Sequence, residues 1–484
     1  MILDKNYYFN IFHTREEDLG ELCSLALSKG GDWVDLFFEN TQIMSLMLKD
    51  SVVSSGAISV DYGVGIRTIK GEKTGYAYTE STDKVSMRNA LLASCSIAQG
   101  APVHVPSIAS DSGYVPRLYK GRPNPAADRY PVQRDWRDCP MDELVPVLEK
   151  IEEMIRSRES RTVNVMAMMA STTSDILMYN SHGELKYETR PMGVISVSAL
   201  FSNGSTTYQN QVSRSFRMGV EMITDDLLEE IASHIVKDLD ARFEAKRPKG
   251  GTMKVVMGAG ASGILLHEAM GHAFEADFIR KRQSIFTDSL GQRVCPKGIT
   301  IVDDGTIRFN RGSLNFDDEG VPAQRTVMVE DGVLTSFLHD RISARFYGVQ
   351  PTGNGRRDGF RSYPIPRMRA TYMEGGDASR EDIIASVEKG IYVDEFSNGQ
   401  VKIGEGDFTF YVKSGYLIEN GTLTAPVKDI NVIGNGPEVL RDILAVGNDP
   451  VIDPSAWTCG KEQSAAVSCG IPTVLVGKLT VGGQ

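Results

Sequence analysis

Two histidines and a glutamate are the residues of this chain best suited to chemistry. His267 and His272 are the ends of the segment HEAMGH, and Glu268 directly follows the first of them. Neutral imidazoles bind divalent metals, and a carboxylate beside them can take a proton from a water molecule that the metal has activated. The segment therefore indicates a hydrolytic metal site.

The spacing of the two histidines differs from that of the usual zinc-protease motif. In HExxH the histidines are four residues apart on one face of a helix, whereas His272 is the fifth residue after His267. On a regular α-helix a spacing of five turns the side chains about 140° apart, against about 40° for four. A π-helical turn, with about 4.4 residues per turn, would reduce the angle to about 50°. Either the helix is locally overfilled or the histidines do not share a metal.

A third ligand is needed as well, because a catalytic zinc usually has three protein ligands and one open position. Cys459 lies in WTCGKEQS, where the following glycine and lysine favour an accessible thiolate, and Cys469 lies in an apolar run that suits a buried, inert thiol. Glu275 and Asp277 could instead hydrogen-bond an imidazole or lie on a solvated acidic face. The residues favour Cys459 over Cys469 but leave five candidates: Glu275, Asp277, His339, Cys459 and Cys469.

A second motif gives a competing hypothesis. Residues 258–263 read GAGASG, which matches the dinucleotide fingerprint GxGxxG after a strand and at a helix start. Nothing after this segment repeats a strand–helix pattern, and the glycines equally suit a tight turn with close helix packing. A nucleotide-binding oxidoreductase is therefore a minor hypothesis, and no cofactor-binding residue is assigned.

Composition restricts the class of protein. A chain of 484 residues with 41% hydrophobic and 24% charged residues fits a soluble protein of two or three domains. The net charge of −11 argues against direct nucleic-acid binding over a broad surface. Six widely separated cysteines indicate reduced thiols. We expect no membrane span and a cytoplasmic location, because no apolar run approaches 18 residues and the N-terminal residues do not resemble a signal peptide.

The elements of the first half predict an α+β domain over residues 1–248, in two segments of about 1–100 and 127–245. A long connection runs from Gly100 to about Pro131. Hydrophobic periodicity and turn residues predict helices at 15–30, 83–99, 141–158 and 225–244, and strands at 33–40, 42–49, 62–79, 162–170, 174–179 and 192–202.

The second half, 249–484, follows the linker KRPKGG and has a different pattern. A strand at 253–257 precedes a helix at 258–279 that carries the histidines. Later strand runs are joined by hairpin-type signals: Asp304-Gly305, Asp331-Gly332, Asn398-Gly399 and Asn420-Gly421. The predicted fold class is thus α+β in two domains, mixed α/β layers followed by a mainly antiparallel β domain with the motif helix.

Several separated segments together resemble the TldD/PmbA family of metallopeptidases, formerly described as modulators of DNA gyrase. They occur in the family's order over nearly the whole chain: YGVGIRTIKGEKTGYAY, HEAMGHAFEAD, FDDEGVPAQRTVMVEDG, PTGNGRRDGF, PRMRATYM, GYLIENGTLTAPV, CGKEQS and LTVGGQ. The chain is similar to the TldD branch, since the partner branch, TldE or PmbA, lacks HExxxH.

The resemblance implies one zinc ion per active subunit, with His267, His272 and Cys459 as ligands and Glu268 as general base. It implies a peptidase that hydrolyses unfolded or short peptides. It also implies a dimer, homomeric or with a TldE/PmbA-like subunit, that encloses the active sites in a chamber. A non-catalytic, peptide-binding partner subunit is the alternative, and the intact HExxxH and Cys459 argue against it.

Extended peptide can add as a strand to an exposed sheet edge, where main-chain hydrogen bonds supply affinity. Gly353–Arg357 (GNGRR) is a candidate loop near such an edge, because glycines permit close backbone approach. Its arginines could equally belong to a solvated turn.

Overall fold

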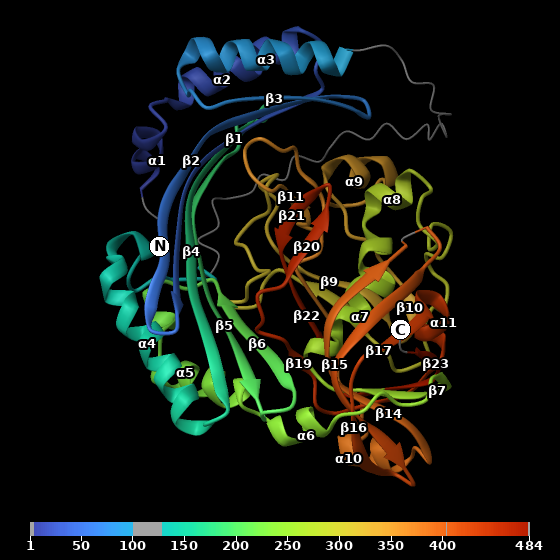
Figure 1. The fold of residues 1–484 in the computed structure, drawn as a ribbon. Coiled ribbons are helices and arrows are strands. Elements are labelled where there is room, and N and C mark those ends of the chain that lie inside the picture. The colour runs from blue at the N-terminus through green and yellow to red at the C-terminus, as the bar shows by residue number, and fades with distance from the viewer. Residues whose placement is uncertain (1–3, 100–127, 403, 483–484) are drawn as a thin grey trace.

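The computed structural model describes residues 4–99, 128–402 and 404–482. Long, curved strands of the first half form one side of the molecule, and the strand-rich second half packs inside their curve (Figure 1). Among the described residues, no helix combines the length and the apolar character needed to cross a membrane.

The first half is built on one six-stranded sheet in the order β3-β2-β1-β4-β5-β6, with every neighbouring pair antiparallel. Buried and less buried residues alternate along β4, as expected of a strand with one face against a core. The strands are β1 (Trp33–Lys49), β2 (Val52–Lys70), β3 (Lys73–Thr79), β4 (Thr162–Asn180), β5 (Leu185–Ser202) and β6 (Thr207–Phe216).

Helices cover this sheet in two groups, each over its own hydrophobic core. In α4, Leu144, Leu148, Ile151 and Ile155 recur at helical spacing and are buried on one face. In α5, the Thr224 hydroxyl accepts a hydrogen bond from the backbone N–H of Leu227 and so caps the first turn. The helices are α1 (Lys5–Ile11), α2 (Glu16–Ser28), α3 (Lys84–Gln99), α4 (Met141–Arg158), α5 (Asp225–Ile235) and α6 (Leu239–Glu244).

The second half contains a closed ring of strands in the order β14-β7-β23-β17-β15, because β14 pairs with both β7 and β15. Strands β16 and β18 pair with β15 and β23 respectively. The bounds are β7 (Gly251–Met257), β14 (Lys389–Val401), β15 (Asp407–Glu419), β16 (Thr422–Val427), β17 (Ile430–Asn435), β18 (Ile443–Val446) and β23 (Val474–Gly482).

A second sheet of this half has the order β10-β9-β8-β13-β22-β19. Its strands are β8 (Ile301–Asp304), β9 (Arg325–Glu330), β10 (Val333–Leu334), β13 (Ala370–Met373), β19 (Val451–Ile452) and β22 (Ser468–Ile471). Two short pairs, β11 (Gly355–Arg356) with β12 (Ile365–Pro366) and β20 (Thr458–Lys461) with β21 (Gln463–Ala466), stand apart. The remaining α-helices are α7 (Ile264–Leu266), α8 (Ala276–Arg280), α9 (Arg341–Tyr347), α10 (Arg380–Ala385) and α11 (Gly436–Arg441).

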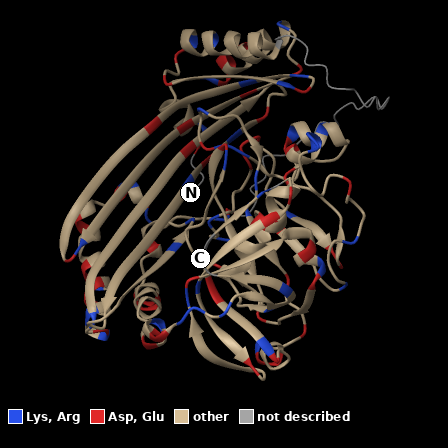
Figure 2. Ribbon diagram, turned by 45° about the vertical axis from the view of Figure 1, so that its right-hand side comes forward, with Lys and Arg blue, Asp and Glu red and all other residues tan. Residues whose placement is uncertain are grey.

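Buried ion pairs join the two halves, and Figure 2 shows basic and acidic ribbon segments along the region where they meet. Arg67 of β2 contacts Glu319 at 2.7 Å, and the Arg190 guanidinium of β5 donates to Asp318. Arg357 reaches back to Asp35 of β1 at 3.4 Å. Paired charges therefore fill much of this contact region.

The α+β class is confirmed, and the second half is mainly antiparallel, with β7–β14 and β13–β22 as the parallel pairs among the described strands. Several boundaries were wrong. Residues 33–49 form one strand rather than two, and the run 62–79 turns at Gly71, whose φ is 60°. The helix predicted over 225–244 breaks at Asp238, which has a left-handed φ of 56°. The division between domains at residue 248 stays a prediction.

Two of the four predicted hairpin turns are confirmed. Asp331-Gly332 joins β9 to β10 and Asn420-Gly421 joins β15 to β16, each pair with positive φ at both residues. Asp304-Gly305 instead opens a long connection to β9, and Asn398-Gly399 lies inside β14 where its register shifts. Most of the connection predicted from Gly100 to about Pro131 lies outside the described residues.

Candidate metal centre

The helix that carries the two histidines contains a π-helical turn over His267–Gly271. The backbone N–H of His272 donates to the carbonyl of His267, five residues earlier, so the turn holds one residue more than an α-helical turn. The ring centroids of His267 and His272 are consequently 5.0 Å apart. The overfilled helix inferred from the spacing is thus present.

Small residues let this distorted turn pack closely. A Cβ added to Gly271 would lie 2.1 Å from the sulfur of Met368, and one added to Gly436 would lie 2.3 Å from the carbonyl of Ala269. The helix then ends at Glu275, whose backbone is extended, so the helix predicted over 258–279 is interrupted there before α8. The interruption places Glu275 beside His272.

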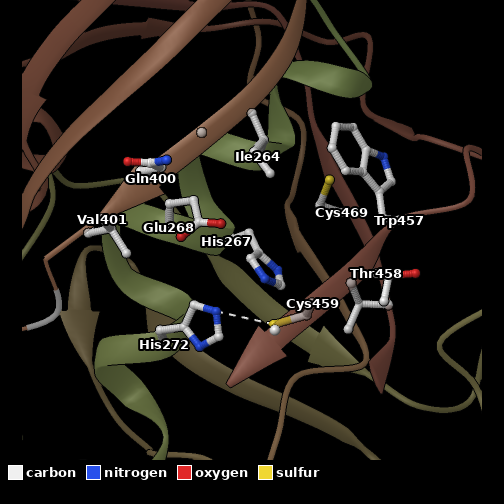
Figure 3. A pocket seen from close by; sticks show the side chains of 13 residues that line it. Ile264, His267, Glu268, His272, Gln400, Val401, Trp457, Thr458, Cys459 and Cys469 are labelled. Carbon is white, nitrogen blue, oxygen red and sulfur yellow. Dashed lines mark hydrogen bonds between the residues drawn. The ribbon is translucent and has the colours of Figure 1, made fainter. Parts of the chain in front are cut away.

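Three potential ligands meet at this turn. The ligand atoms of His267, His272 and Cys459 all lie within 4.8 Å of one another, and all three side chains are buried. The His272 Nε2 is 3.1 Å from the Cys459 sulfur, as Figure 3 shows. Cys459 comes from β20, where the tight turn to β21 presents it to the helix. The structure therefore brings together the residues predicted as ligands.

The electrostatics of this group favour a thiolate. Burial would raise the pKa of Cys459, but the His267 and His272 imidazoles beside it lower that pKa to about 5. Burial would lower the pKa of His272, but Glu275 and Cys459 raise it to about 10. Negative charge is thus favoured on the Cys459 sulfur, which faces the His272 Nε2 at the position where a cation would bind. The pKa of Cys459 is lowered as expected of a thiolate, but the histidines rather than Lys461 lower it, and its side chain is buried rather than accessible.

The other candidate ligands have different partners. The His339 Nδ1 lies 3.3 Å from the Ser343 hydroxyl, and burial lowers the pKa of His339 to about 4. Cys469 borders the same cavity as Cys459, but burial raises its pKa well above the usual value. Both residues lie outside the three-residue group found among the described residues.

Glu275 and Asp277 belong to a buried network behind His272, and the solvated acidic face considered as an alternative is wrong. The Glu275 carboxylate lies 3.0 Å from the His272 Nδ1 and 3.0 Å from the Lys461 ammonium. Lys461 also contacts Asp277 at 2.7 Å. Arg367 donates to the Cys459 carbonyl and lies 3.7 Å from Glu275. This network orients the His272 ring. Arg367 lies in the segment PRMRATYM that contributes to the family resemblance, but no role at the site was predicted for it.

A cavity of about 460 Å³ opens onto the three ligands, and Glu268 lies in its wall. Burial raises the pKa of Glu268, against the opposing effect of the two imidazoles. Figure 3 shows Gln400 and Val401 on one side and Trp457 on the other, so the cavity separates the end of β14 from the segment that leads into β20. A small extended ligand has room beside Glu268.

The glycines of residues 258–263 have structural roles. Gly260 adopts a φ of 86°, and a Cβ added to Gly263 would lie 2.4 Å from the backbone nitrogen of Gly470. The tight turn and close packing weighed against nucleotide binding are therefore present. The alternative of a solvated turn for GNGRR was wrong, because Arg356 and Arg357 are buried.

Family models match three parts of the chain. Residues 34–98 match domain 1 of the PmbA/TldA metallopeptidases, residues 134–242 match the central domain, and residues 250–483 match the C-terminal domain. The last match includes the whole candidate metal centre.

Curated relatives cover nearly the full length. A metalloprotease TldD homolog of Haemophilus influenzae is 37% identical over 458 residues, which is 93% of each chain. One from Buchnera aphidicola is 35% identical, covering 96% of this chain and 95% of the relative. A metalloprotease of Methanothermobacter thermautotrophicus is 30% identical, covering 93% and 96%.

Solved structures share the fold. One described as a modulator of a DNA gyrase from Thermotoga maritima is 23% identical, with a TM-score of 0.77 over 96% of this chain and 100% of that chain. TldE from Thermococcus kodakarensis is 19% identical, with a TM-score of 0.72 over 96% and 100%. Together with the family models and the relatives, these matches show that the chain belongs to the PmbA/TldD family of metallopeptidases.

Proposed function

We propose that this chain is a zinc-dependent peptidase that hydrolyses unfolded or short peptides. The observation that carries the proposal is the meeting of His267, His272 and Cys459 at one cavity that also contains Glu268. Three protein ligands with an accessible fourth position are typical of catalytic rather than structural zinc sites.

The donor set fits zinc. Two imidazole nitrogens and one thiolate are the ligand types that zinc prefers. The His267 Nδ1 is buried without a hydrogen-bond partner in the described structure, which suits a ring whose polar contacts a cation would complete. When bound, zinc would polarise the scissile carbonyl and make water more acidic. His267, His272 and Cys459 would hold it.

Glu268 has the position of a general base. Its carboxylate would accept a proton from the attacking water and return it to the departing amine, so that the amine leaves in its neutral form. Its partly buried place beside the histidines favours proton exchange, because burial raises the pKa of its carboxyl group. Peptide hydrolysis needs both proton transfers.

The strand beside the cavity supports binding of extended peptide. β14 pairs with β15 along its length, but it pairs with β7 only over residues 390–393. Within the described residues, the later part of β14 therefore has one edge without a neighbouring strand, and Gly399, Gln400 and Val401 at its end line the cavity. A peptide could add along this edge through main-chain hydrogen bonds, with little demand on its sequence.

Glu275 is expected to fix the metal-binding orientation of His272. Replacing Glu275 by glutamine removes the carboxylate that faces the imidazole Nδ1, and loss of such a partner lowers metal affinity about 10–100-fold. Zinc affinity measured by competition with a chromogenic chelator checks this. Asp277→Asn is the matched control, since Asp277 shares Lys461 but does not contact His272. Equal zinc affinity in Glu275→Gln and the parent would contradict the assigned role.

We expect unfolded chains to reach the cavity and folded proteins to be excluded from it. We propose a dimer, homomeric or with a TldE/PmbA-like subunit, that encloses the active sites as the family resemblance implies. Reduced and alkylated ribonuclease A should then be cut at least about 10³-fold faster than native ribonuclease A, because a stable domain is unfolded only about one part in 10³ to 10⁸ of the time. Gel-based cleavage rates measure the ratio. Equal rates would refute restricted access, and a monomer by light scattering, without and with the partner subunit, would refute the dimer.

A further inference from the structure

A second cavity, of about 340 Å³, lies between the curved sheet and the second half of the chain. We call it the arginine cavity, after Arg217, Arg311 and Arg356 in its wall. All three are buried, with exposed fractions of 7%, 9% and 6%. Thr458, the residue before the candidate ligand Cys459, lines both this cavity and the one at the metal centre.

These three arginines have neutral partners. Arg311 donates to the Ser215 and Thr458 hydroxyls and to the Trp457 carbonyl. Arg356 donates to two backbone carbonyls, those of Met368 and Ala466.

Arg217 has the fewest contacts. Its Nη1 is 3.4 Å from the carbonyl of Pro191, its guanidinium lies over the Tyr130 ring, and its Nε has no hydrogen-bond partner in the part of the chain that the structure describes. Among the described residues, no carboxylate lies within ion-pair distance of Arg217, Arg311 or Arg356.

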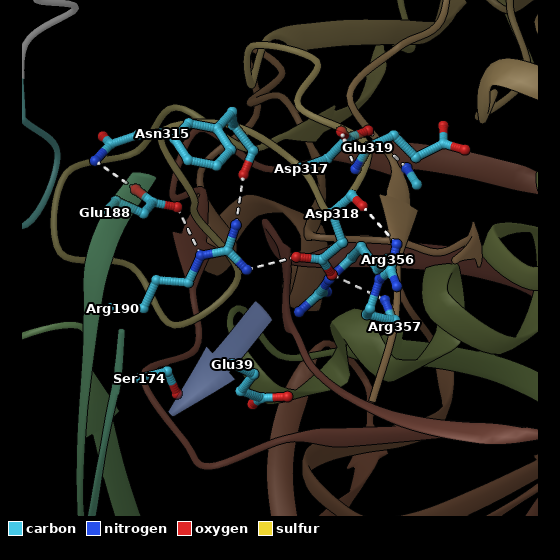
Figure 4. Close-up of polar contacts among 12 residues, drawn as sticks. Glu39, Ser174, Glu188, Arg190, Asn315, Asp317, Asp318, Glu319, Arg356 and Arg357 are labelled. Atoms are coloured by element: carbon cyan, nitrogen blue, oxygen red, sulfur yellow. Dashed lines mark hydrogen bonds and ion pairs between the residues drawn. The ribbon is translucent and has the colours of Figure 1, made fainter. Parts of the chain in front are cut away.

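The acidic groups of the cavity are already engaged. Asp318 accepts from Arg190 and from the backbone of Arg357 (Figure 4). The Arg357 side chain also reaches Asp35. Glu39 accepts from the Phe360 backbone and from the Thr41 hydroxyl. Asp358, at the exposed rim, accepts from the Ser464 backbone. The three arginines therefore have no ion-pair partner of their own among the described residues, and the charge of Asp318 offsets that of Arg356 only from a greater distance.

Burying a cation without a counter-ion is unfavourable, and the chain shows the effect. Burial lowers the pKa of Arg217 and of Arg311 to about 10. It also lowers the pKa of Arg356, and the neighbouring cations, Arg369 first and then Arg367 and Arg217, lower it further against the opposing effect of Asp318. An anion bound in the cavity would relieve this repulsion and use the free guanidinium N–H groups, which match a carboxylate in geometry.

The cavity's place beside the metal centre identifies which anion fits. Arg311 contacts Trp457 and Thr458, and both residues also line the cavity that contains Glu268. We propose that the arginine cavity binds a carboxylate of the peptide whose scissile bond lies at the metal centre. This deepens the proposed peptidase function and rests on it. The carboxylate is either the C-terminus of the peptide or an aspartate or glutamate side chain.

The test measures binding rather than turnover, by fluorescence anisotropy on the zinc-loaded Glu268→Gln protein. Its probes are fluorescein-labelled Ala-Phe-Ala-Phe-Ala-Ala as the free acid, the same peptide as the C-terminal amide, and two amides with the last alanine replaced by Glu or by Gln. The acid should bind about tenfold more tightly than the amide if the terminus is recognised, and the Glu peptide about tenfold more tightly than the Gln peptide if a side chain is. Equal affinities within both pairs would overturn the proposal.

Variants distinguish carboxylate binding in the arginine cavity from carboxylate binding to the zinc ion, which also attracts carboxylates. Arg217→Met removes a cation without a counter-ion, so the protein should keep its melting temperature while the preference for the carboxylate falls about tenfold. Arg217→Lys should restore part of the preference for the carboxylate. Arg356→Met should lower this preference as well, which tests the arginine cavity independently of Arg217. Arg282→Met, which removes an exposed arginine paired with Asp288, should change nothing.

The outcomes also separate this proposal from the peptidase function. A carboxylate preference that survives unchanged in folded Arg217→Met and Arg356→Met would overturn the cavity's role and leave the peptidase intact. A preference that depends on the arginines, in a parent protein that cuts no peptide under any zinc loading, would support the cavity and overturn the peptidase.

Discussion

Replacing Glu268 by glutamine is expected to lower peptide cleavage by about 10²–10⁴-fold, the usual contribution of a general acid–base group. The amide has nearly the shape of the carboxylate but cannot accept the proton of the attacking water. Zinc should stay bound, because Glu268 is not one of the three residues that meet as potential ligands. Cleavage of an internally quenched peptide, together with elemental analysis of the same sample, measures both quantities.

Glu462→Gln is the matched control for this change. Glu462 lies in the turn between β20 and β21, is exposed and does not line the cavity. Its substitution should leave the cleavage rate within about twofold, as expected for a surface change. A Glu268→Gln protein that cleaves as fast as the Glu462→Gln protein would remove Glu268 from the mechanism.

Replacing Cys459 by alanine is expected to remove the metal as well as the activity. The change deletes one of three ligands, so zinc affinity should fall by more than the roughly 100-fold that loss of an outer partner costs. The two histidines left behind, His267 and His272, make a weaker site for zinc than the three-ligand set. Zinc content after dialysis against a weak chelator gives the direct measurement, and cleavage of the quenched peptide gives the second.

Cys469→Ala supplies the comparison for Cys459→Ala, because both cysteines are buried at the same cavity. Cys469 lies in β22 outside the three-residue group, so its substitution should leave zinc content and cleavage near those of the parent. Stoichiometric zinc in the Cys459→Ala protein, or zinc lost only from the Cys469→Ala protein, would exclude Cys459 as a ligand.

Local sequence was sufficient for the helical part of the site and insufficient for the rest. The spacing of His267 and His272 required a π-helical turn if they were to act together, and helix geometry alone sets that condition. The third ligand was different, since the residue types favoured Cys459 over Cys469 but left five candidates, and only the family resemblance selected Cys459 among them. Which of them approaches the helix depends on pairing between β20 and β21, far along the chain.

The difference between local and long-range information also explains which elements of the fold were predicted correctly and which were not. Helix α4 was predictable because its buried face recurs every three or four residues. Residues 52–61 of β2 were missed because nearly all of them are exposed, so no alternation of buried and exposed side chains marks the strand. Arg356 and Arg357 could be interpreted as a solvated turn because some of the groups that bury them, such as Ala466 and Tyr76, lie over a hundred positions away in sequence.

The sequence separation within the candidate centre bears on when the protein can become active during its synthesis. His272 and Cys459 are 187 positions apart, and Cys459 lies in the hairpin of β20 and β21. A nascent chain that has exposed both histidines still lacks the thiolate, and so does any product of premature termination before residue 459. With Cys459 as the proposed third ligand, hydrolytic capacity would thus arrive only after residue 459 has been synthesised, and shorter products would not cut the unfolded chains around them.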